Sequence, residues 1–278
     1  MGAISPKLVK ELREMTGAGL KDCKAALEEG EGNIDKAIEV IRKKGLAKAA
    51  KKAGRATKEG EIRCVTTDKA TIFAEIVCET DFAAKNQKFI DFVDGVLERI
   101  AAGDYAEGDI TEAVQDAEKD NVGAIVGTIG ENIQITRVVR WETAGNVYNY
   151  IHDGGGVKIA ALVDVEGVDD AEFGKLLAMH ITASAPQYIS PEDVPAELVE
   201  KERDIAASTP DMANKPENII GKIVDGRINK WYTEICLLKQ NWIHDDKISV
   251  EKAKPGLKIN RFVRWQVGEI SPEPTEED

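Results

Sequence analysis

The sequence is poor in the residues that most often perform bond chemistry or bind transition metals. It contains three histidines and four cysteines among 278 residues, and the cysteines at 23, 64, 78 and 236 form no C-x-x-C pair. A zinc site needs clustered Cys or His ligands, so none is expected. Each cysteine lies in an apolar pattern, and we therefore expect buried, reduced thiols, which fits the cytosol.

Long apolar runs are also missing. No uncharged apolar stretch approaches the roughly 20 residues that a transmembrane helix needs. The first seven residues lack the hydrophobic region of a secretory signal, and position 6 is Pro, where a myristoylation motif has Ser or Thr. We therefore expect a cytoplasmic protein that does not bind membranes.

Charge is unevenly distributed along the chain. The formal net charge of −13 argues against binding of a nucleic-acid backbone as the main activity. Residues 1–58 nevertheless carry 14 Lys and Arg against 8 Asp and Glu, whereas the remaining residues carry 23 against 42. This asymmetry fits either an N-terminal unit that meets an acidic partner surface or a basic helix face exposed to solvent.

Three short helical patterns occupy the N-terminal region. Ser5 and Pro6 are typical of an N-cap and a first helical residue. Apolar stripes follow at helical spacing, and Gly45 is typical of the residue after a helix end. We expect a three-helix domain over residues 1–54, with a basic and partly helical linker over residues 46–59.

From Gly60 onward, the apolar pattern alternates with a period of two, which is typical of strands. The predicted elements are a strand hairpin around 67–69, helices around 89–100 and 110–127, and a strand at 133–141. A second strand–turn–strand–helix order follows around the turn at 154–156. This repeated order predicts an α+β fold with two related subdomains built on antiparallel sheets, one at 55–140 and one at 141–190 with 231–270.

A charged stretch at 191–230 interrupts the second subdomain. Pro210 and Pro216 divide it into two helical patterns, and we expect a polar helical hairpin that projects from the core. A second copy and another partner are both compatible with such a hairpin, and the sequence does not choose between them. Strand character is predicted from Trp231 to Leu238 and from Ile259 to Val267. Residues 271–278 form an acidic tail that we expect to be disordered.

The most informative segment is Glu79-Thr80-Asp81-Phe82-Ala83-Ala84-Lys85-Asn86. It follows an apolar run at 72–78 and precedes a helical pattern. A carboxylate and an aromatic ring therefore lie on a strand-to-helix turn, where side chains project from a rigid scaffold. Phe82 has the character of a wedge that inserts into a partner; the simpler interpretation is an N-cap at Asp81 and a core residue at Phe82.

This segment resembles the signature T-D-F-V-A-K-N of the elongation factor Ts family, with Ala83 in place of Val. Further similar segments are Leu8–Leu27, Ile129–Ile133 with Arg137, Ala178–Ala183, Glu234–Leu238 and Arg261–Trp265. The resemblance implies a translation elongation factor that exchanges GDP for GTP on elongation factor Tu, without bond chemistry and without a cofactor of its own. It also implies that the N-terminal helices form a ubiquitin-associated-like unit that docks on the GTPase domain of that partner.

The resemblance further implies which residues meet the partner. Asp81 and Phe82, flanked by Thr80 and Ala83, are expected to intrude beside the Mg²⁺-facing side of the GTPase domain and to promote release of GDP and Mg²⁺. His152 is expected at the same interface. The expected N-terminal contacts are Lys10, Arg13, Leu20 and Lys21.

Two departures and one assembly question accompany the resemblance. Ala83 has two methyl groups fewer than Val, a difference of about 1 kcal/mol of packing if the position is buried. The sequence ends soon after Glu269, so the C-terminal helical module of some longer members is not expected. A homodimer of the complex with elongation factor Tu is compatible with the sequence.

Two other functions fit individual residues. Glu79, Asp81 and His152 could form the acid–base set of an enzyme. However, the glycines at 154–156 lack the Lys and the Ser or Thr of a phosphate-binding loop. Residues 42–58 could bind RNA, but they are interleaved with Ala rather than with aromatic residues. His180 lies on an apolar helical stripe and is expected to be a core residue.

Overall fold

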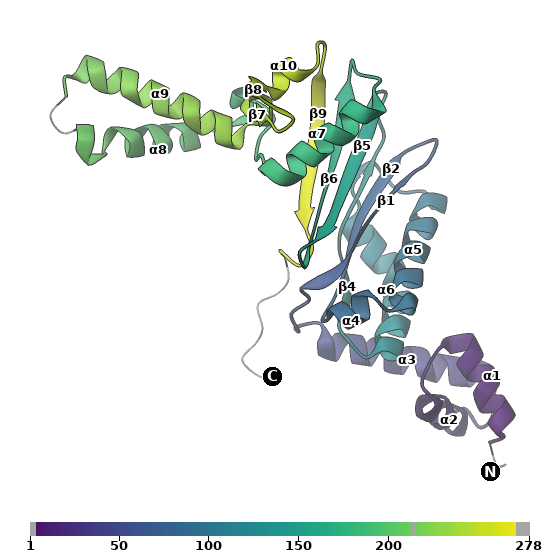
Figure 1. Cartoon of the computed structure of the whole chain (residues 1–278). Helices are drawn as coiled ribbons and strands as arrows, with labels where there is room; N and C mark the ends of the chain where they lie inside the picture. Colours follow the sequence, from purple (N-terminus) through teal and green to yellow (C-terminus); the bar gives the residue numbers. More distant parts are fainter. Residues whose placement is uncertain (1–3, 213–214, 271–278) are drawn as a thin grey trace. The chain divides into compact units, whose positions relative to one another are not determined.

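A computed structural model describes residues 4–212 and 215–270, which divide into two compact units (Figure 1). Of the described residues, the first unit comprises 4–142, 156–158 and 266–270, and the second comprises 143–155, 159–212 and 215–265. Both units combine helices with strands, which confirms the α+β class. The finer division into five parts stays a prediction, and the expected disordered tail at 271–278 lies outside the described residues.

The first unit begins with three helices and continues into a four-stranded sheet. Its elements are α1 (Pro6–Thr16), α2 (Leu20–Glu29), α3 (Ile34–Lys52), β1 (Glu59–Thr66), β2 (Thr71–Cys78), α4 (Asp81–Ala84), α5 (Gln87–Ala102), β3 (Gly108–Asp109), α6 (Thr111–Ile129) and β4 (Ile133–Trp141). The strand order is β1-β2-β4-β3, with antiparallel pairs. Helices α5 and α6 cover one face of this sheet (Figure 1), where Phe89 and Val126 join Ile76 in one buried cluster.

The helix starts in the N-terminal region follow the sequence signals. Ser5 Oγ accepts a hydrogen bond from Leu8 N at 3.2 Å, with Pro6 as the first helical residue. Asn33 caps α3 through its side chain, and Gly17 ends α1 with φ +64°. These contacts confirm three helices around a small buried core. Their likeness to a ubiquitin-associated domain stays a prediction.

Helix α3 is longer than predicted, because Gly45 does not end it. The helix continues to Lys52, and Gly45 lies where α3 crosses α6. A Cβ atom on Gly45 would lie 2.5 Å from the carbonyl oxygen of Gly123. Gly45 therefore allows two helices to approach closely and does not form a turn. The sequence around position 45 alone does not reveal this role.

The expected basic linker at 46–59 is helix up to Lys52, so it is partly helical as predicted, and several basic residues of α3 pair with other elements of the same unit. Lys48 Nζ lies 2.9 Å from Asp22, and Lys44 Nζ lies 2.8 Å from Glu29, so α3 is paired with α2. Arg42 pairs with Asp120 of α6. Much of the N-terminal positive charge thus neutralises carboxylates within the chain.

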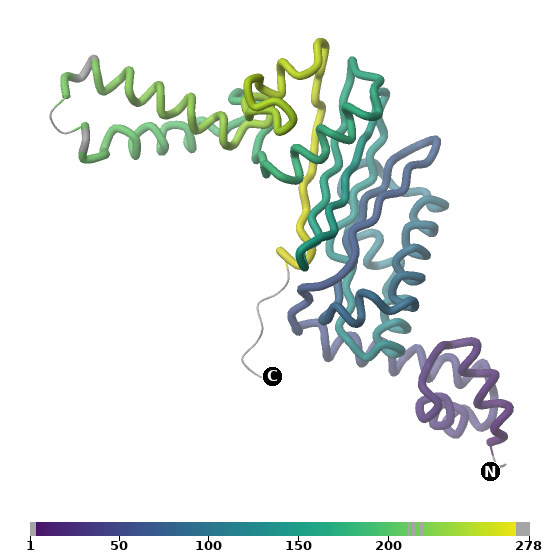
Figure 2. The backbone as a smooth tube through the Cα atoms, in the orientation of Figure 1, coloured from purple at the N-terminus to yellow at the C-terminus, as the bar shows by residue number. Residues whose placement is uncertain are grey.

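The second unit combines a three-stranded sheet with the charged helical hairpin. Its elements are β5 (Asn146–Gly154), β6 (Val157–Glu166), α7 (Ala171–Ser184), η1 (Pro191–Asp193), α8 (Ala196–Ala207), η2 (Pro210–Met212), α9 (Glu217–Ile235), η3 (Leu237–Lys239), β7 (Asn241–Trp242), β8 (Asp245–Ser249), α10 (Val250–Ala253) and β9 (Lys258–Gln266). The sheet order is β5-β6-β9, and β7 pairs with β8. The backbone of α8 and α9 runs out and back (Figure 2), which confirms the predicted pair of helices.

The strand expected from Trp231 to Leu238 is wrong, because α9 continues to Ile235. Val224, Ile228 and Trp231 recur at helical spacing and form a small cluster with Ala206 of α8. This packing outweighs the strand preference of the aromatic and β-branched residues. The same spacing is visible in the sequence and was the signal that could have corrected the prediction.

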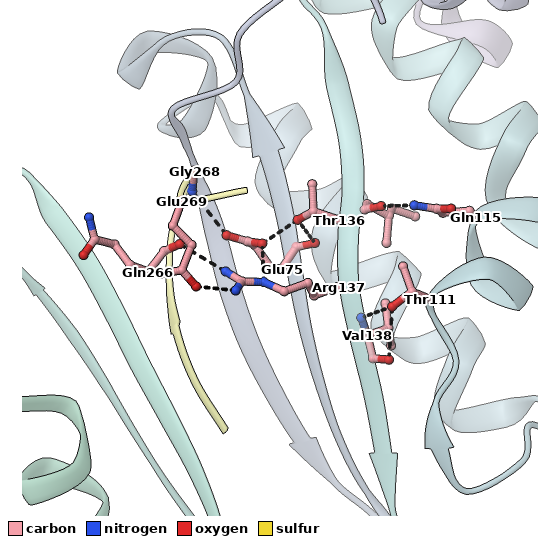
Figure 3. Close-up of polar contacts among 10 residues, drawn as sticks. Glu75, Thr111, Gln115, Thr136, Arg137, Val138, Gln266, Gly268 and Glu269 are labelled. Carbon is pink, nitrogen blue, oxygen red and sulfur yellow. Dashed lines mark hydrogen bonds and ion pairs between the residues drawn. The ribbon is translucent and has the colours of Figure 1, made fainter. Parts of the chain in front are cut away.

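A buried carboxylate ties the end of the described chain to the first unit's sheet (Figure 3). Glu75 of β2 is fully buried and accepts hydrogen bonds from Arg137 Nε at 2.8 Å and Gly268 N at 3.2 Å. Arg137 of β4 also donates to the carbonyl of Gln266 and pairs with Glu269. The charge of Glu75 is thus both paired and hydrogen-bonded, the condition under which a buried ion pair is tolerated.

Candidate functional site

The signature segment forms the turn between β2 and the short helix α4. Thr80 is the N-cap of α4, and its Oγ1 accepts a hydrogen bond from Ala83 N at 3.2 Å. The next helix follows at once, with Asn86 capping α5 through its side chain. Two successive capped helix starts leave little conformational freedom between residues 80 and 86.

Phe82 points away from this fixed turn. It is 83% exposed, more than any other large apolar side chain in the described part of the chain. Its neighbours Ala83 and Ala84 are buried in the cluster beneath the sheet, so the backbone on its C-terminal side is anchored. The interpretation of Phe82 as a core residue is therefore wrong. An exposed aromatic ring on an anchored turn is apolar surface presented to a partner.

Asp81 is the first residue of α4 and is not its N-cap, which is Thr80. Its carboxylate lies 2.8 Å from Lys85 Nζ, one helical turn along. The hydrogen bond from Lys85 and its charge hold the pKa of Asp81 below the ordinary value. Asp81 is therefore an ionised carboxylate beside the Phe82 ring at neutral pH. Because the ion pair is exposed, it is weak enough to exchange for a partner's group.

Ala83 is 3% exposed, so the substitution of the family's Val lies in the packed base of the turn. Its backbone N–H is held by the Thr80 hydroxyl. Position 83 therefore belongs to the packed support of the turn and not to the surface offered to a partner. The expected softening of that support stays a prediction.

A second segment makes hydrogen bonds to the turn between β2 and α4. This segment is the corner at residues 130–132, between α6 and β4. Both oxygens of Glu131 accept hydrogen bonds from Thr80, one from its backbone N at 3.0 Å and one from its Oγ1 at 2.7 Å. Asn132 N donates to the Glu79 carboxylate. Residues 129–133 resemble a segment of the elongation factor Ts family, but the resemblance assigns no role to Glu131. The partners are 51 residues apart, so no local pattern announces the contact.

The N-terminal candidates lie on α1 and α2. Lys10, Arg13 and Lys21 are exposed, and Lys10 has a loose i,i+4 partner, Glu14, at 3.6 Å. Leu20 is 56% exposed at the start of α2. Met15, near the C-terminal end of α1, is a further apolar residue that is 60% exposed, although it follows Leu8 and Leu12 at helical spacing.

The two histidine predictions have different outcomes. His152 is exposed on β5 of the second unit, 6.4 Å from the Tyr150 ring between centroids, and its contact with a partner stays a prediction. His180 is fully buried, as expected of a core residue. Its Nδ1 accepts from Ile243 N and its Nε2 lies 3.0 Å from Gln240 Oε1. Burial lowers the pKa of the His180 imidazole, so it is a neutral structural group.

Three further features of the described part of the chain bear on metal binding, acid–base chemistry and membrane insertion. Within residues 4–212 and 215–270, no three His, Cys, Asp or Glu side chains lie together as metal ligands. Glu79, considered as part of an acid–base set, is bound to Asn132 and lies 3.5 Å from Arg55. Among the helices in the described ranges, none is both long and apolar enough to cross a bilayer.

The four cysteines are free thiols. Three are buried and Cys64 is half-buried. Burial raises the pKa of Cys64 and of Cys78 to about 12. These thiols are therefore protonated and poor nucleophiles, which agrees with a structural role.

Comparisons with known proteins agree over almost the whole chain. A family model described as "Elongation factor TS" matches residues 79–269. The chain is 43% identical to "Elongation factor Ts" of Halothermothrix orenii, over 99% of this chain and 95% of that protein. It is 44% identical to the protein of the same name from Clostridium botulinum strain Alaska E43, over 96% and 93%. For Protochlamydia amoebophila the identity is 38%, over 97% and 100%.

Proposed function

The chain belongs to the elongation factor Ts family, and from this premise we propose that it is a translation elongation factor that exchanges guanine nucleotide on elongation factor Tu. It acts as an exchange factor and not as an enzyme of bond chemistry. It works in the cytoplasm, where its partner GTPase carries out elongation. It needs no cofactor of its own, since the nucleotide and Mg²⁺ belong to the partner.

The physical task of such a factor is differential binding. A GTPase holds its nucleotide through phosphate contacts and Mg²⁺. A factor that binds the nucleotide-free state more tightly weakens nucleotide binding by the same ratio, because the two equilibria are linked. A change from mostly bound to mostly released needs roughly 5 kcal/mol of differential affinity. A few well-buried interface residues supply energies of that size.

The observation that carries the proposal is the exposure of Phe82 on an anchored turn. Transfer of a Phe side chain from water into an apolar crevice contributes about 2–3 kcal/mol. The turn is already ordered, so little conformational entropy is lost when the ring inserts. We assign Thr80, Asp81, Phe82 and Ala83 to the element that enters the GTPase domain near its Mg²⁺ and displaces nucleotide.

The other candidate residues then act as docking contacts. Lys10, Arg13 and Lys21 offer exposed positive charge on α1 and α2, and Leu20 offers an apolar contact. These groups bring the GTPase to the wedge and increase the lifetime of the complex. His152 of β5 contributes a contact from the second unit. Association of two complexes into a dimer is compatible with these assignments.

The rival functions have less support. The basic residues 42–58, which an RNA-binding function would use, include Arg42, Lys44 and Lys48, each paired with a carboxylate of the chain. Free positive charge along this segment is thereby reduced. In the acid–base set of the rival enzyme, the Glu79 carboxylate already accepts a hydrogen bond from Asn132 N, and the Asp81 carboxylate already pairs with Lys85.

The test follows a fluorescent GDP analogue as it leaves elongation factor Tu. Substoichiometric amounts of the chain are expected to accelerate release many-fold, because each molecule acts repeatedly. The chain alone, incubated with GTP, is expected to produce no phosphate. Release at the spontaneous rate, or GTP hydrolysis by the chain alone, would contradict the proposal.

A further inference from the structure

Glu131 makes an unusual contact with the turn that carries Phe82. One carboxylate oxygen accepts from Thr80 N at 3.0 Å and the other from Thr80 Oγ1 at 2.7 Å. Both donors belong to one residue, and that residue is the N-cap of α4. Hydrogen bonds to a carboxylate are about twice as strong as those between neutral groups, so this contact outweighs an ordinary cap.

The geometry points to Glu131 as a positioning residue for Asp81 and Phe82, an inference that rests on the exchange function proposed above. A threonine hydroxyl has one proton, and Thr80 gives it to Glu131. The lone pairs of the same oxygen then face Ala83 N, whose N–H donates a hydrogen bond to Thr80 Oγ1 at 3.2 Å. Glu131 therefore fixes both the backbone of Thr80 and the rotation of its hydroxyl.

The consequence reaches Phe82 through its neighbours. Thr80 is held by Glu131 on one side, and Ala83 is held by burial on the other. Phe82 lies between these two fixed points and has an exposed ring. Its direction is therefore set by the backbone between residues 80 and 83 and not by packing of the ring.

Glu131 is itself fixed by the corner at residues 130–132. Gly130 ends α6 with φ +88°, and its carbonyl accepts from Lys52 Nζ at 2.6 Å. Asn132 is buried, and its Nδ2 donates to the carbonyl of Arg55 at 2.8 Å. The corner thus makes hydrogen bonds both to the end of α3 and its following residues and to the turn that bears Phe82.

The experiment measures GDP-analogue release from elongation factor Tu at saturating concentrations of each variant. Glu131→Gln keeps the shape of the side chain, but its NH₂ group faces one of the two Thr80 donors and cannot accept a hydrogen bond from it. This variant is expected to lower the maximal rate about tenfold. Thr80→Val is expected to have a similar effect, whereas Thr80→Ser keeps both donors and is expected to be slowed much less than Thr80→Val. The double variant Glu131→Gln, Thr80→Val is expected to be no slower than either single variant, because both substitutions act on the same interaction between Glu131 and Thr80.

The matched control is Glu118→Gln. Glu118 also accepts hydrogen bonds through both carboxylate oxygens, from Arg99 Nε at 2.7 Å, Arg99 Nη2 at 2.8 Å and Asn121 Nδ2 at 2.8 Å, and it lies in the same unit. This variant is expected to lose stability in thermal unfolding and to keep the wild-type maximal rate. It separates a loss of positioning from a loss of folding.

Three results would overturn the inference. Glu131→Gln could retain the wild-type rate, it could be slowed only as much as Glu118→Gln, or the effects of the double variant could multiply. Phe82→Ala, measured in parallel, separates this failure from failure of the proposed function. If Phe82→Ala is slow while Glu131→Gln is fast, only the positioning role is lost; if Phe82→Ala is fast, the wedge itself is wrong and the positioning role is lost with it.

Discussion

Phe82 and Phe89 lie seven positions apart, and one ring is 83% exposed while the other is fully buried. The difference arises because the chain ends α4 and starts α5 between them. Phe89 is on the inward face of α5, whereas Phe82 is in the first turn of α4, on the side away from the cluster. The sequence predicts the turn and the residue types from the end of an apolar run. It does not predict which ring is exposed, because exposure depends on the orientation of a four-residue helix.

At the residue scale, the ion pair between Asp81 and Lys85 predicts a pH dependence. Lys85→Met is expected to raise the pKa of Asp81 toward its ordinary value, because the hydrogen bond and the positive charge are removed. A lowered pKa in the folded state means that the pair stabilises the fold above the unfolded-state pKa. This contribution is lost as pH falls through the folded-state pKa, and it is small for an exposed pair.

Nuclear magnetic resonance of the carboxyl carbons checks this expectation, with a titration over about pH 2–6. Lys69→Met is the control, since Lys69 is an exposed residue on the hairpin between β1 and β2. An Asp81 pKa that does not change in Lys85→Met would contradict the assigned cause.

At the scale of elements, the length of α3 is a feature that the local sequence does not determine. The caps at Ser5 and Asn33 were predictable, since each is a local contact between residues three apart. The continuation of α3 through Gly45 was not, because it depends on Gly123, which is 78 positions away. The same holds for Glu131, whose contact with Thr80 joins two distant turns. Local signals determine where helices begin, and distant partners determine where some continue.

The crossing of α3 and α6 gives a stability prediction. Gly45→Ala would place a methyl group 2.5 Å from the Gly123 carbonyl oxygen, so the helices must separate. We expect a loss of about 2 kcal/mol in the free energy of unfolding, as for other overpacked contacts. Urea denaturation measures this loss.

Gly127→Ala is the matched control on the same helix pair. Its Cβ would lie 3.6 Å from the Gly45 Cα atom, an ordinary contact distance. Because alanine is the better helix former, this variant is expected to be neutral or more stable by up to about 1 kcal/mol. Equal losses in the two variants would show that the close approach is not the cause.

At the scale of the whole molecule, docking and displacement are assigned to different parts of the first unit. The exposed charges lie on α1 and α2, and the wedge lies between β2 and α5. The identities of these residues came from the resemblance to the family and not from composition or periodicity. Their exposure came from the structure, which also added Met15 and Glu131.

This division predicts that substitutions in the docking helices change the affinity for the partner without changing the maximal rate of exchange. Arg13→Glu with Lys21→Glu is expected to raise the concentration for half-maximal exchange about tenfold at low salt, with the maximal rate nearly unchanged, because surface charges mainly alter association. Lys69→Glu with Lys247→Glu makes the same charge change at exposed residues outside the docking helices and is expected to have little effect. A lower maximal rate in the docking variant would contradict the division of roles.

The most direct test of the account is the release of a fluorescent GDP analogue from elongation factor Tu, measured at saturation with the wild-type chain and with Phe82→Ala. Because the ring is exposed, its removal is expected to change the free energy of unfolding by less than about 0.5 kcal/mol. The maximal release rate is expected to fall at least about tenfold, since the apolar insertion is lost. Equal stimulation by Phe82→Ala and the wild-type chain, with both fully folded, would contradict the wedge.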